Sequence, residues 1–330
     1  MMRTARHRRL PLAAARTLAA AMALAHAASA VYAAPASGAA QAARGFQFAV
    51  IGHPLQHDRD EAALKRAIGD ATQGDPAFVV ATGIKAASEP CSDKLYAQRH
   101  ALLNESPQPM IVSLAGSDWT ACLNSAGRSN AIERLNRLRE LFYVDGESLG
   151  ARHIGVTRMS STAKFRSYAE NAHWEYGKVL FATINLPANN NHYRAEAGRN
   201  SEYEDRLVAN RAWLHRLFTL AARQKMHGIV LFSDGDPRVT AEEGFSLLSS
   251  FQTKQDGFAE VRKQIRALAE KYKGKVLLID AQRGAAGEPA IQWRDNVGHL
   301  HMAADWAEVR VTPGAAALFT IKSGSAEAPQ

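Results

Sequence analysis

Residues 46–58 read FQFAVIGHPLQHD, and this stretch decides the fold class. The run at 46–51 is almost continuously apolar and has the length of a strand. A strand exposed on one face alternates polar and apolar residues, so this run predicts a strand buried on both faces. Gly52 ends the run and places His53 just beyond the strand. The ends of strands are where α/β proteins collect binding and catalytic side chains.

Strands and helices alternate along the rest of the chain. Apolar runs predict strands at 77–82, 110–116, 178–185, 228–237 and 275–280, and two strands around a Pro-Gly turn at 306–323. Apolar residues at helical spacing predict helices at 58–71, 93–105, 129–142, 201–225 and 254–273, with Ser92 as the N-cap of the second. Residues 145–177 are polar and predict an irregular segment. This order predicts one α/β domain with mixed sheets covered by helices.

The first 33 residues have the pattern of a secretory signal peptide. Five arginines lie in or before an Ala- and Leu-rich run without acidic residues: Arg3, Arg6, Arg8, Arg9 and Arg16. A membrane anchor is the alternative, but the run is shorter than the ~20 strongly apolar residues that a span needs. We therefore expect an exported protein, periplasmic or secreted, with residues 34–44 as a linker. We expect no membrane span after the leader.

The net charge depends on this leader. The whole chain carries a formal charge of +8, and removal of the five leader arginines would leave +3. A protein that binds a polyanion mainly by charge carries a larger excess of Lys and Arg. A polyanion-binding module is therefore disfavoured, and we expect no specific nucleic-acid partner.

Cys91 and Cys122 are the two cysteines of the chain. An even number in an exported protein favours a disulfide, and the alternative is a pair of buried free thiols. The two residues lack the Cys-x-x-Cys spacing of a zinc ribbon.

Short polar or Gly-containing motifs follow most of the predicted strands. They are GHPLQHD, ATGIK, AGSDW, SDGDP and IDAQRG. From about Phe46 to Thr320 the chain resembles the calcineurin-like metallophosphoesterases. The resemblance is carried by the strand followed by IGxP, by GIKAASEPCSD and GSDWTAC, by the NNN loop before AWLHRLF, and by the strand at Trp306. It implies an αββα sandwich over residues 45–322, followed by a tail at 323–330.

The resemblance also implies a dinuclear centre of Mn, Zn or Fe that activates water for attack on a phosphoester. The family's metal ligands are altered here. His53 stands where the family has Asp, and Gly83 stands where a carboxylate bridges the two metals. Asp234 or its neighbour replaces a histidine, and the segment from Asp280 replaces a Gly-His-x-His motif. We therefore expect a degenerate site that holds one or two ions weakly, or none.

The residues that the resemblance places at this site remain candidates. The candidate metal ligands are His53, Ser117, Asp234 and Asp280, and the candidate catalytic residues are His53, Asp118 and His192. Each has a structural alternative. His53 can bond to the backbone, Asp118 can be a structural acid, His192 can be an ordinary loop residue, and turn chemistry explains Asp234 and Asp236 equally well.

Two further features leave alternatives open. The sequence Gly-His-x-His occurs at Gly298–His301. It is either the family's last metal-binding motif, displaced along the sequence, or a polar strand at the edge of a sheet with both histidines on one face. Lys85 follows the second strand, where it either contacts an anion or is solvated like most lysines.

The favoured function is that of an exported phosphoesterase-fold protein with weak or no hydrolytic activity, in a binding or pseudoenzyme role. The alternative is an active phosphoester hydrolase whose metal site is rebuilt from His53, Asp118, Asp234 and Asp280, with or without His299 and His301. A small phosphoester or phosphate-like molecule is the ligand class that both functions imply. No sequence feature sets an oligomeric state.

We predict that the exported chain begins near Ala34, because the leader ends in the small residues that signal peptidases cleave after. N-terminal sequencing of protein from the periplasm or medium tests this. Recovery of residues 1–30 on membrane-bound protein would instead establish the anchor.

Overall fold

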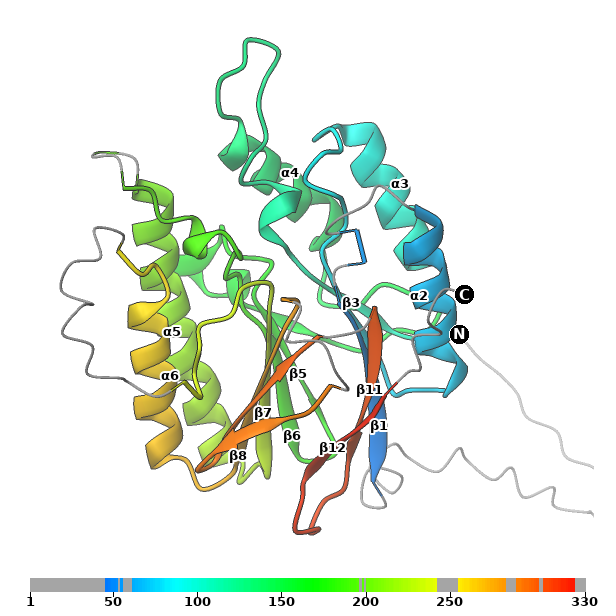
Figure 1. Ribbon diagram of the computed structural model, residues 1–330, viewed down its shortest axis with the longest axis vertical. Coiled ribbons are helices and arrows are strands. Elements are labelled where there is room, and N and C mark those ends of the chain that lie inside the picture. The colour runs from blue at the N-terminus through cyan, green and yellow to red at the C-terminus, as the bar shows by residue number, and fades with distance from the viewer. Residues whose placement is uncertain are drawn as a thin grey trace, which may run out of the picture. The chain divides into compact units, whose positions relative to one another are not determined.

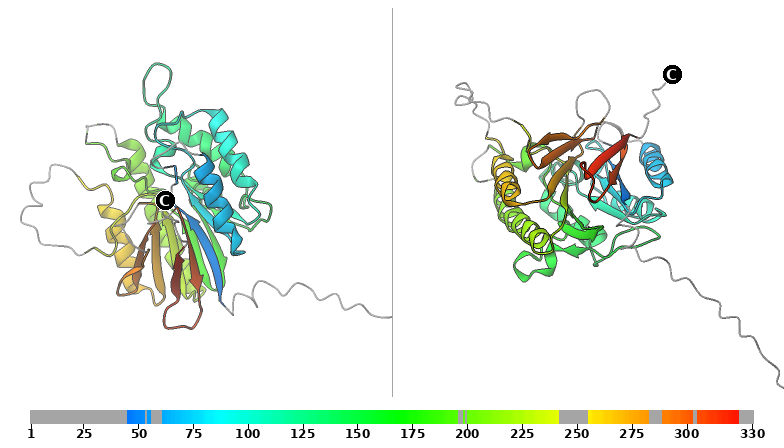
Figure 2. Two further views of the ribbon diagram at one scale, coloured as in Figure 1. Left: turned by 45° about the vertical axis from the view of Figure 1, so that its right-hand side comes forward. Right: turned by 90° about the horizontal axis from the view of Figure 1, so that it is seen from below.

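Two mixed β-sheets lie face to face, and helices cover the outer face of each (Figures 1 and 2). The computed structural model describes residues 45–52, 54–55, 61–195, 198, 200–241, 255–282, 289–302 and 305–323. All of these residues belong to one compact unit. The expected α/β class, with mixed sheets flanked by helices, is confirmed.

The smaller sheet has five strands in the order β12-β11-β1-β2-β3. They span Phe46–Ile51 (β1), Val79–Thr82 (β2), Met110–Ser113 (β3), Trp306–Val311 (β11) and Phe319–Ser323 (β12). Strands β1, β2 and β3 run parallel, whereas β11 is antiparallel to both β1 and β12. The first strand of the fold is therefore held between β2 and a strand from the end of the chain.

The larger sheet has seven strands in the order β4-β5-β6-β7-β8-β10-β9. They span Thr157–Arg158 (β4), Ala172–Tyr176 (β5), Val179–Thr183 (β6), Gly228–Ser233 (β7), Lys275–Asp280 (β8), Gln292–Arg294 (β9) and Val297–His301 (β10). Strands β6, β7, β8 and β10 run parallel. Their carboxyl ends therefore lie at one edge of the sheet.

The core between the two sheets is built from aromatic and branched side chains. Phe48 of β1 stacks on Phe78 and meets Phe181 of β6 edge to face, with ring centres 5.3 Å and 5.2 Å apart. Trp174 of β5 stacks on both Phe181 and Phe232. Alternate residues of β1 point the other way, where Ala49 and Ile51 pack under the helices. Burial on both faces explains the nearly continuous apolar run at 46–51.

In the ranges that the structure describes, five α-helices cover the outer faces. Helices α2 (Glu61–Gln73), α3 (Asp93–Asn104) and α4 (Ala131–Phe142) pack on the five-stranded sheet, and α5 (Ser201–Arg223) and α6 (Ala259–Lys271) pack on the seven-stranded sheet. Ser92 caps α3 as predicted, since its hydroxyl accepts a hydrogen bond from the backbone N–H of Leu95. Short 3₁₀ turns occur at Gly116–Asp118, Met159–Ser161, Ala163–Phe165 and Asn190–His192.

Two sequence-based expectations about strands were wrong. The segment 145–177 is not irregular throughout, because it contains β4 and β5, and Ala172–Trp174 is buried. Most of its polar residues lie in the connections on either side of β5, although His173 and Glu175 lie within the strand. The Gly298–His301 strand is not an edge strand, because β10 pairs with β8 on one side and β9 on the other.

Several predicted segments lie outside the described residues. These are the leader at 1–33, the linker at 34–44, the first three residues of the helix expected at 58–71 and the first residue of the helix expected at 254–273. The tail expected at 323–330 also lies outside the described residues, except for Ser323, which ends β12. Within the described ranges, none of the helices combines the length and hydrophobicity that a membrane span requires.

Cys91 and Cys122 form the expected disulfide, with Cα atoms 5.8 Å apart. Cys91 lies just before α3, and Cys122 lies in the loop after β3. The Tyr96 hydroxyl donates to the carbonyl of Asp118, which lies four residues before Cys122. The bridge and this hydrogen bond together attach the β3 loop to α3.

We predict that Phe181→Ala lowers the free energy of unfolding by about 3–5 kcal/mol, because it opens a cavity among stacked rings between the sheets. Leu123→Ala is the control, since Leu123 is 62% exposed, and we expect a change within about 0.5 kcal/mol. Urea unfolding of both variants measures the difference. Equal effects would show that the aromatic core does not dominate stability.

Candidate functional site

Loops from both sheets meet at the carboxyl ends of the parallel strands. One carboxylate oxygen of Asp234, just after β7, accepts hydrogen bonds from the backbone N–H groups of Gly116 (2.7 Å) and Ala188 (2.8 Å). Gly116 follows β3 in the other sheet, and a side chain there would meet Pro187 and Asn189 at 3.2 Å. Asp234 thus joins the β3, β6 and β7 loops.

Asp118 has a similar role within the five-stranded sheet. Its carboxylate accepts hydrogen bonds from the backbone N–H groups of Ile84, Lys85 and Ala115, at 2.8–3.2 Å. The side chain is fully buried. These contacts fasten the β2 loop to the β3 loop.

Lys85 is buried beneath these loops and is not solvated. Its ammonium donates hydrogen bonds to the carbonyls of Ala86 and Ser117, both at 2.8 Å. Burial lowers its pKa, and the neighbouring charge of Asp118 opposes that effect. Gly83, two residues earlier, has φ +75°, a conformation that glycine adopts at little cost. A cationic side chain therefore lies inside the loops where the resemblance implies a metal.

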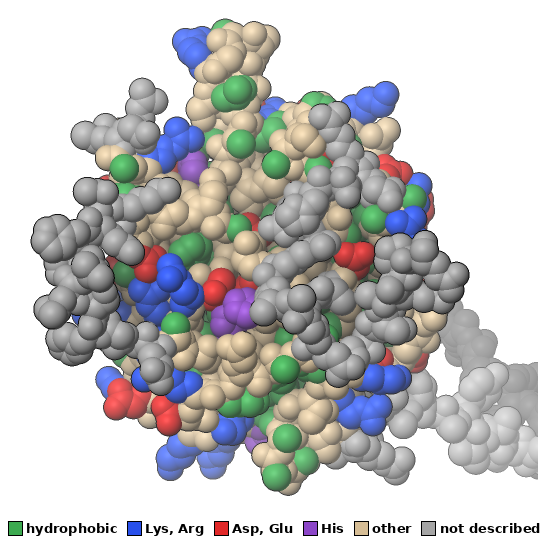
Figure 3. Space-filling model, viewed as in Figure 1, with side chains coloured by type: hydrophobic (Ala, Val, Ile, Leu, Met, Phe, Trp, Pro, Cys, Tyr) green, Lys and Arg blue, Asp and Glu red, His purple; other side chains and the backbone are tan. Residues whose placement is uncertain are grey.

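A second group of polar side chains lies along the end of the seven-stranded sheet. Asp280 ends β8, and His301 lies beside it in register at the end of β10. His299 lies two residues earlier on the same face. Its Nε2 atom is 2.5 Å from Asp280 Oδ2 and 3.4 Å from a carboxylate oxygen of Asp236. On the face shown in Figure 3, histidine side chains lie next to acidic ones near the middle.

His301 is held in an orientation that suits a metal ligand. Its Nδ1 atom is 3.0 Å from Asp280 Oδ2, and its Nε2 atom faces Asp236 at 3.9 Å. The hydrogen bond to Asp280 raises the pKa of His301. Burial acts to raise the pKa of Asp280, but its hydrogen bonds to His299 and His301 prevail and lower it. Metal-binding histidines are commonly oriented in this way by a carboxylate on the second ring nitrogen.

The donor set fits a divalent transition metal. One ligand atom from each of Asp236, His299 and His301 lies within 4.8 Å of the other two. In a tetrahedral site with bonds of about 2.0 Å, ligand atoms lie roughly 3.3 Å apart, so a modest contraction would suffice. Two imidazoles with carboxylates suit Zn, Mn or Fe better than Ca or Mg.

The loop after β6 carries His192 in an unusual backbone conformation. Asn190, Asn191 and His192 all have φ values of +53° to +54°, which L-residues seldom adopt in succession. Nδ1 of His192 is 2.8 Å from Glu202 of α5, and its ring meets that of Trp119 edge to face. In the described part of the chain, Nε2 of His192 has no hydrogen-bond partner.

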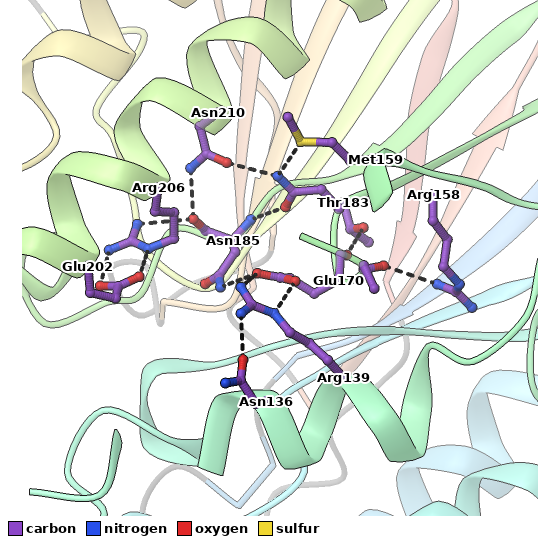
Figure 4. Close-up of polar contacts among 12 residues, drawn as sticks. Asn136, Arg139, Arg158, Met159, Glu170, Thr183, Asn185, Glu202, Arg206 and Asn210 are labelled. Carbon is purple, nitrogen blue, oxygen red and sulfur yellow. Dashed lines mark hydrogen bonds and ion pairs between the residues drawn. The ribbon is translucent and has the colours of Figure 1, made fainter. Parts of the chain in front are cut away.

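Glu202 begins a buried polar network that the sequence did not reveal (Figure 4). Arg206 bonds to Glu202 and to the carbonyl of Asn185, and Asn210 donates to the same carbonyl. The side-chain amide of Asn185 donates to Glu170, which is paired with Arg139 of α4. The network therefore links α5, the β6 loop and α4.

The predicted site residues fall into separate groups. Asp280 joins a cluster with Asp236, His299 and His301. Asp118 and Ser117 lie with Lys85, and the Ser117 hydroxyl donates to the Lys85 carbonyl at 3.1 Å. Asp234 lies between the two sheets, and His192 pairs with Glu202. His53 lies outside the described residues, so its metal and catalytic roles stay predictions, as do the roles proposed for the others.

The missed residues had a detectable signal. Glu202, Arg206 and Asn210 lie four residues apart on the stripe of α5 that continues through Leu214, Leu217 and Ala221. Leu207, which lies off this stripe, is only partly buried. Polar residues at helical spacing in line with an apolar stripe indicate a buried polar contact.

Comparisons with known proteins do not identify a family. No protein-family model matches the chain, and no curated protein matches it.

We predict that Glu202→Gln lowers the free energy of unfolding by about 3 kcal/mol at pH 7. Burial acts to raise the pKa of Glu202, but Arg206 and His192 prevail and lower it to about 2. A carboxyl whose folded pKa lies below its ordinary value of 4.5 stabilises the fold above that pH. The difference between wild type and variant should therefore shrink as the pH falls from 4.5 towards 2.

Urea unfolding at several pH values measures this difference. Glu140→Gln is the matched control, because Glu140 is exposed on α4. A pH-independent cost at Glu202 would mean that its charge does not stabilise the fold.

Proposed function

We propose that this chain is an exported metal-binding protein on a phosphoesterase-like αββα sandwich, with weak or no phosphoester hydrolysis. One observation carries the proposal: Asp236, His299 and His301 present ligand atoms within 4.8 Å of one another. Asp280 lies against both imidazoles and would orient them or complete the ligand set. The ion would lie at the ends of β8 and β10.

Two contacts support one ion rather than a dinuclear centre. The ammonium of Lys85 lies against the loops of the five-stranded sheet, where a nearby cation would be repelled. The carboxylate of Asp118 already accepts three backbone hydrogen bonds there. Gly83 offers no bridging carboxylate. These features favour a binding role over the rebuilt hydrolase.

A bound ion would act as a Lewis acid and would lower the pKa of a coordinated water. The protein would supply the ligands and hold their orientation. Asp280 fixes His301 from the Nδ1 side, so that Nε2 faces the ion. A small phosphoester or phosphate-like molecule is the ligand class that such an ion would attract.

The proposed export rests on the leader sequence and is supported by the disulfide. A bridge between Cys91 and Cys122 is stable in an oxidising compartment and is rare in a reducing one.

We predict that protein purified without chelator binds one equivalent of Zn²⁺ or Mn²⁺ and that His301→Ala weakens this binding at least about 100-fold. Loss of a residue that only hydrogen-bonds to a metal-binding histidine typically lowers metal affinity 10–100-fold. Accordingly, Asp280→Asn should weaken binding about tenfold. Titration calorimetry and elemental analysis measure affinity and stoichiometry.

His215→Ala is the matched control, because His215 is exposed on α5 away from the cluster. Circular dichroism confirms that each variant is folded. Two equivalents of metal, or unchanged affinity in His301→Ala, would contradict the proposed site.

We predict that phosphomonoester and phosphodiester turnover, with Mn²⁺ or Zn²⁺ added, is at least about 10³-fold below ordinary enzymatic rates. Loss of a second ion removes several kcal/mol of transition-state stabilisation, and each 1.4 kcal/mol is about tenfold in rate. Ordinary rates that disappear in His301→Ala would establish the active hydrolase instead.

A further inference from the structure

A cleft of about 740 Å³ opens at the amino ends of β7 and β8, opposite the group of Asp236, Asp280, His299 and His301, here called the Asp-His cluster. The ends of α5 and α6 form one side, and the β11–β12 turn forms the other. Figure 1 shows these segments together at the lower end of the molecule. Ala221, Met226, Tyr272 and Leu318 are buried residues that line the cleft and give it an apolar floor. This volume is typical of small-molecule sites.

The rim of the cleft is cationic. It carries Lys225, Lys271, Lys273 and Lys275, and no described residue that lines the cleft is acidic. The ammonium of Lys275 lies over the Trp293 ring and donates to the Asp295 carbonyl, so the positive charge at the rim rests mainly on the other three lysines. Lysine side chains place their aliphatic stems along apolar surface and their ammonium groups in water. Removal of the leader would leave the chain only slightly basic, so three lysines at one opening, with Lys275 beside them, are a local concentration of positive charge. Figure 3 shows Lys and Arg side chains at this end.

Lys225 reaches the rim from an unfavourable backbone conformation. It follows the last turn of α5 with φ +54°, at the position where glycine usually ends a helix. Its N–H bonds to the Ala222 carbonyl, and that of Met226 bonds to the Ala221 carbonyl, which completes a Schellman motif. A lysine here costs conformational free energy that glycine would avoid. Lys225 therefore occupies a rim position where the backbone conformation favours glycine.

A neighbouring cleft shares Tyr272 and Lys273 but differs in charge. Glu270 and Asp295 line it alongside its basic residues. Its Arg294 donates to the Ala241 carbonyl, and Arg266 donates to the Val239 carbonyl. Mixed charge and engaged arginines make it a poorer anion site than the lysine-rimmed cleft.

We propose that the lysine-rimmed cleft binds an anionic amphiphile, a molecule with a phosphate or carboxylate head and a short apolar tail. The head would lie among the ammonium groups at the rim, and the tail would cover Met226, Tyr272 and Leu318. The inference is independent of the proposed metal site, which lies at the other end of the same strands.

Decyl phosphate, decanoate, decyltrimethylammonium and inorganic phosphate are the probes, each titrated as monomer by calorimetry. We expect the two anionic amphiphiles to bind at least tenfold more tightly than the cationic amphiphile or inorganic phosphate. Ala316→Trp, which fills the cleft from the exposed turn, should abolish binding. Lys271→Gln with Lys273→Gln should weaken binding about tenfold, since each exposed charge contributes modestly.

The Lys225→Gly variant distinguishes a loss of binding from a loss of folding. It should weaken binding about threefold while leaving the melting temperature unchanged or higher. Lys178→Gly is the matched control, because Lys178 also has positive φ and does not line the cleft. It should leave binding unchanged. Equal affinity for anionic and cationic amphiphiles, no binding of decyl phosphate, or full binding by a folded Ala316→Trp variant would each overturn the proposal.

Discussion

Burial of the central strands on both faces is the constraint on which the rest of the structure depends. Phe48 and Val50 of β1 pack between the sheets, while Ala49 and Ile51 pack under the helices. Neither face of such a strand can carry exposed polar chemistry, because buried polar groups need partners. Chemistry is therefore confined to the ends of the strands and the loops that follow them. The Asp-His cluster and the Asp234 contacts lie there for this reason.

The two ends of the seven-stranded sheet differ in charge. At the carboxyl ends of β7 and β8, carboxylates gather with imidazoles and form a site that suits a cation. At the amino ends, lysines surround an apolar opening that suits an anion. Between these ends the strands are wholly apolar. Each of these strands has six residues and spans about 20 Å, roughly twice the Debye length at 0.1 M salt, so salt would largely screen a ligand at one end from charges at the other.

The sequence predicted the parts of the fold that are set by local pattern. Continuous apolar runs located β1, β7 and β8, and Ser92 was correctly expected to cap α3. Strand β5 was missed because its buried residues, Ala172–Trp174, lie in a mostly polar segment. The position of β10 between β8 and β9 depends on pairing, which no local pattern encodes.

The candidate site was less predictable for a related reason. The resemblance placed the candidate ligands at the family's motif positions. Of these candidates, Asp280 lies in the cluster of potential ligands. The contributions of His299, His301 and Asp236 depend on β10 lying in register beside β8. Glu202 and Arg206 have the spacing of an exposed i, i+4 ion pair, and their alignment with the apolar stripe of α5 is the sequence signal that distinguishes them from one.

The pairing of β1 with β11 has a consequence for how the chain acquires its structure. Phe46 pairs with Val311, so the two ends of the described domain form neighbouring strands. Contacts between residues so distant in sequence are slow to form, because a long loop must close first. During synthesis, β1 cannot complete its hydrogen bonds until β11 has been made. The nascent chain therefore stays incompletely folded, with one edge of β1 unpaired, until the residues of β11 have been made.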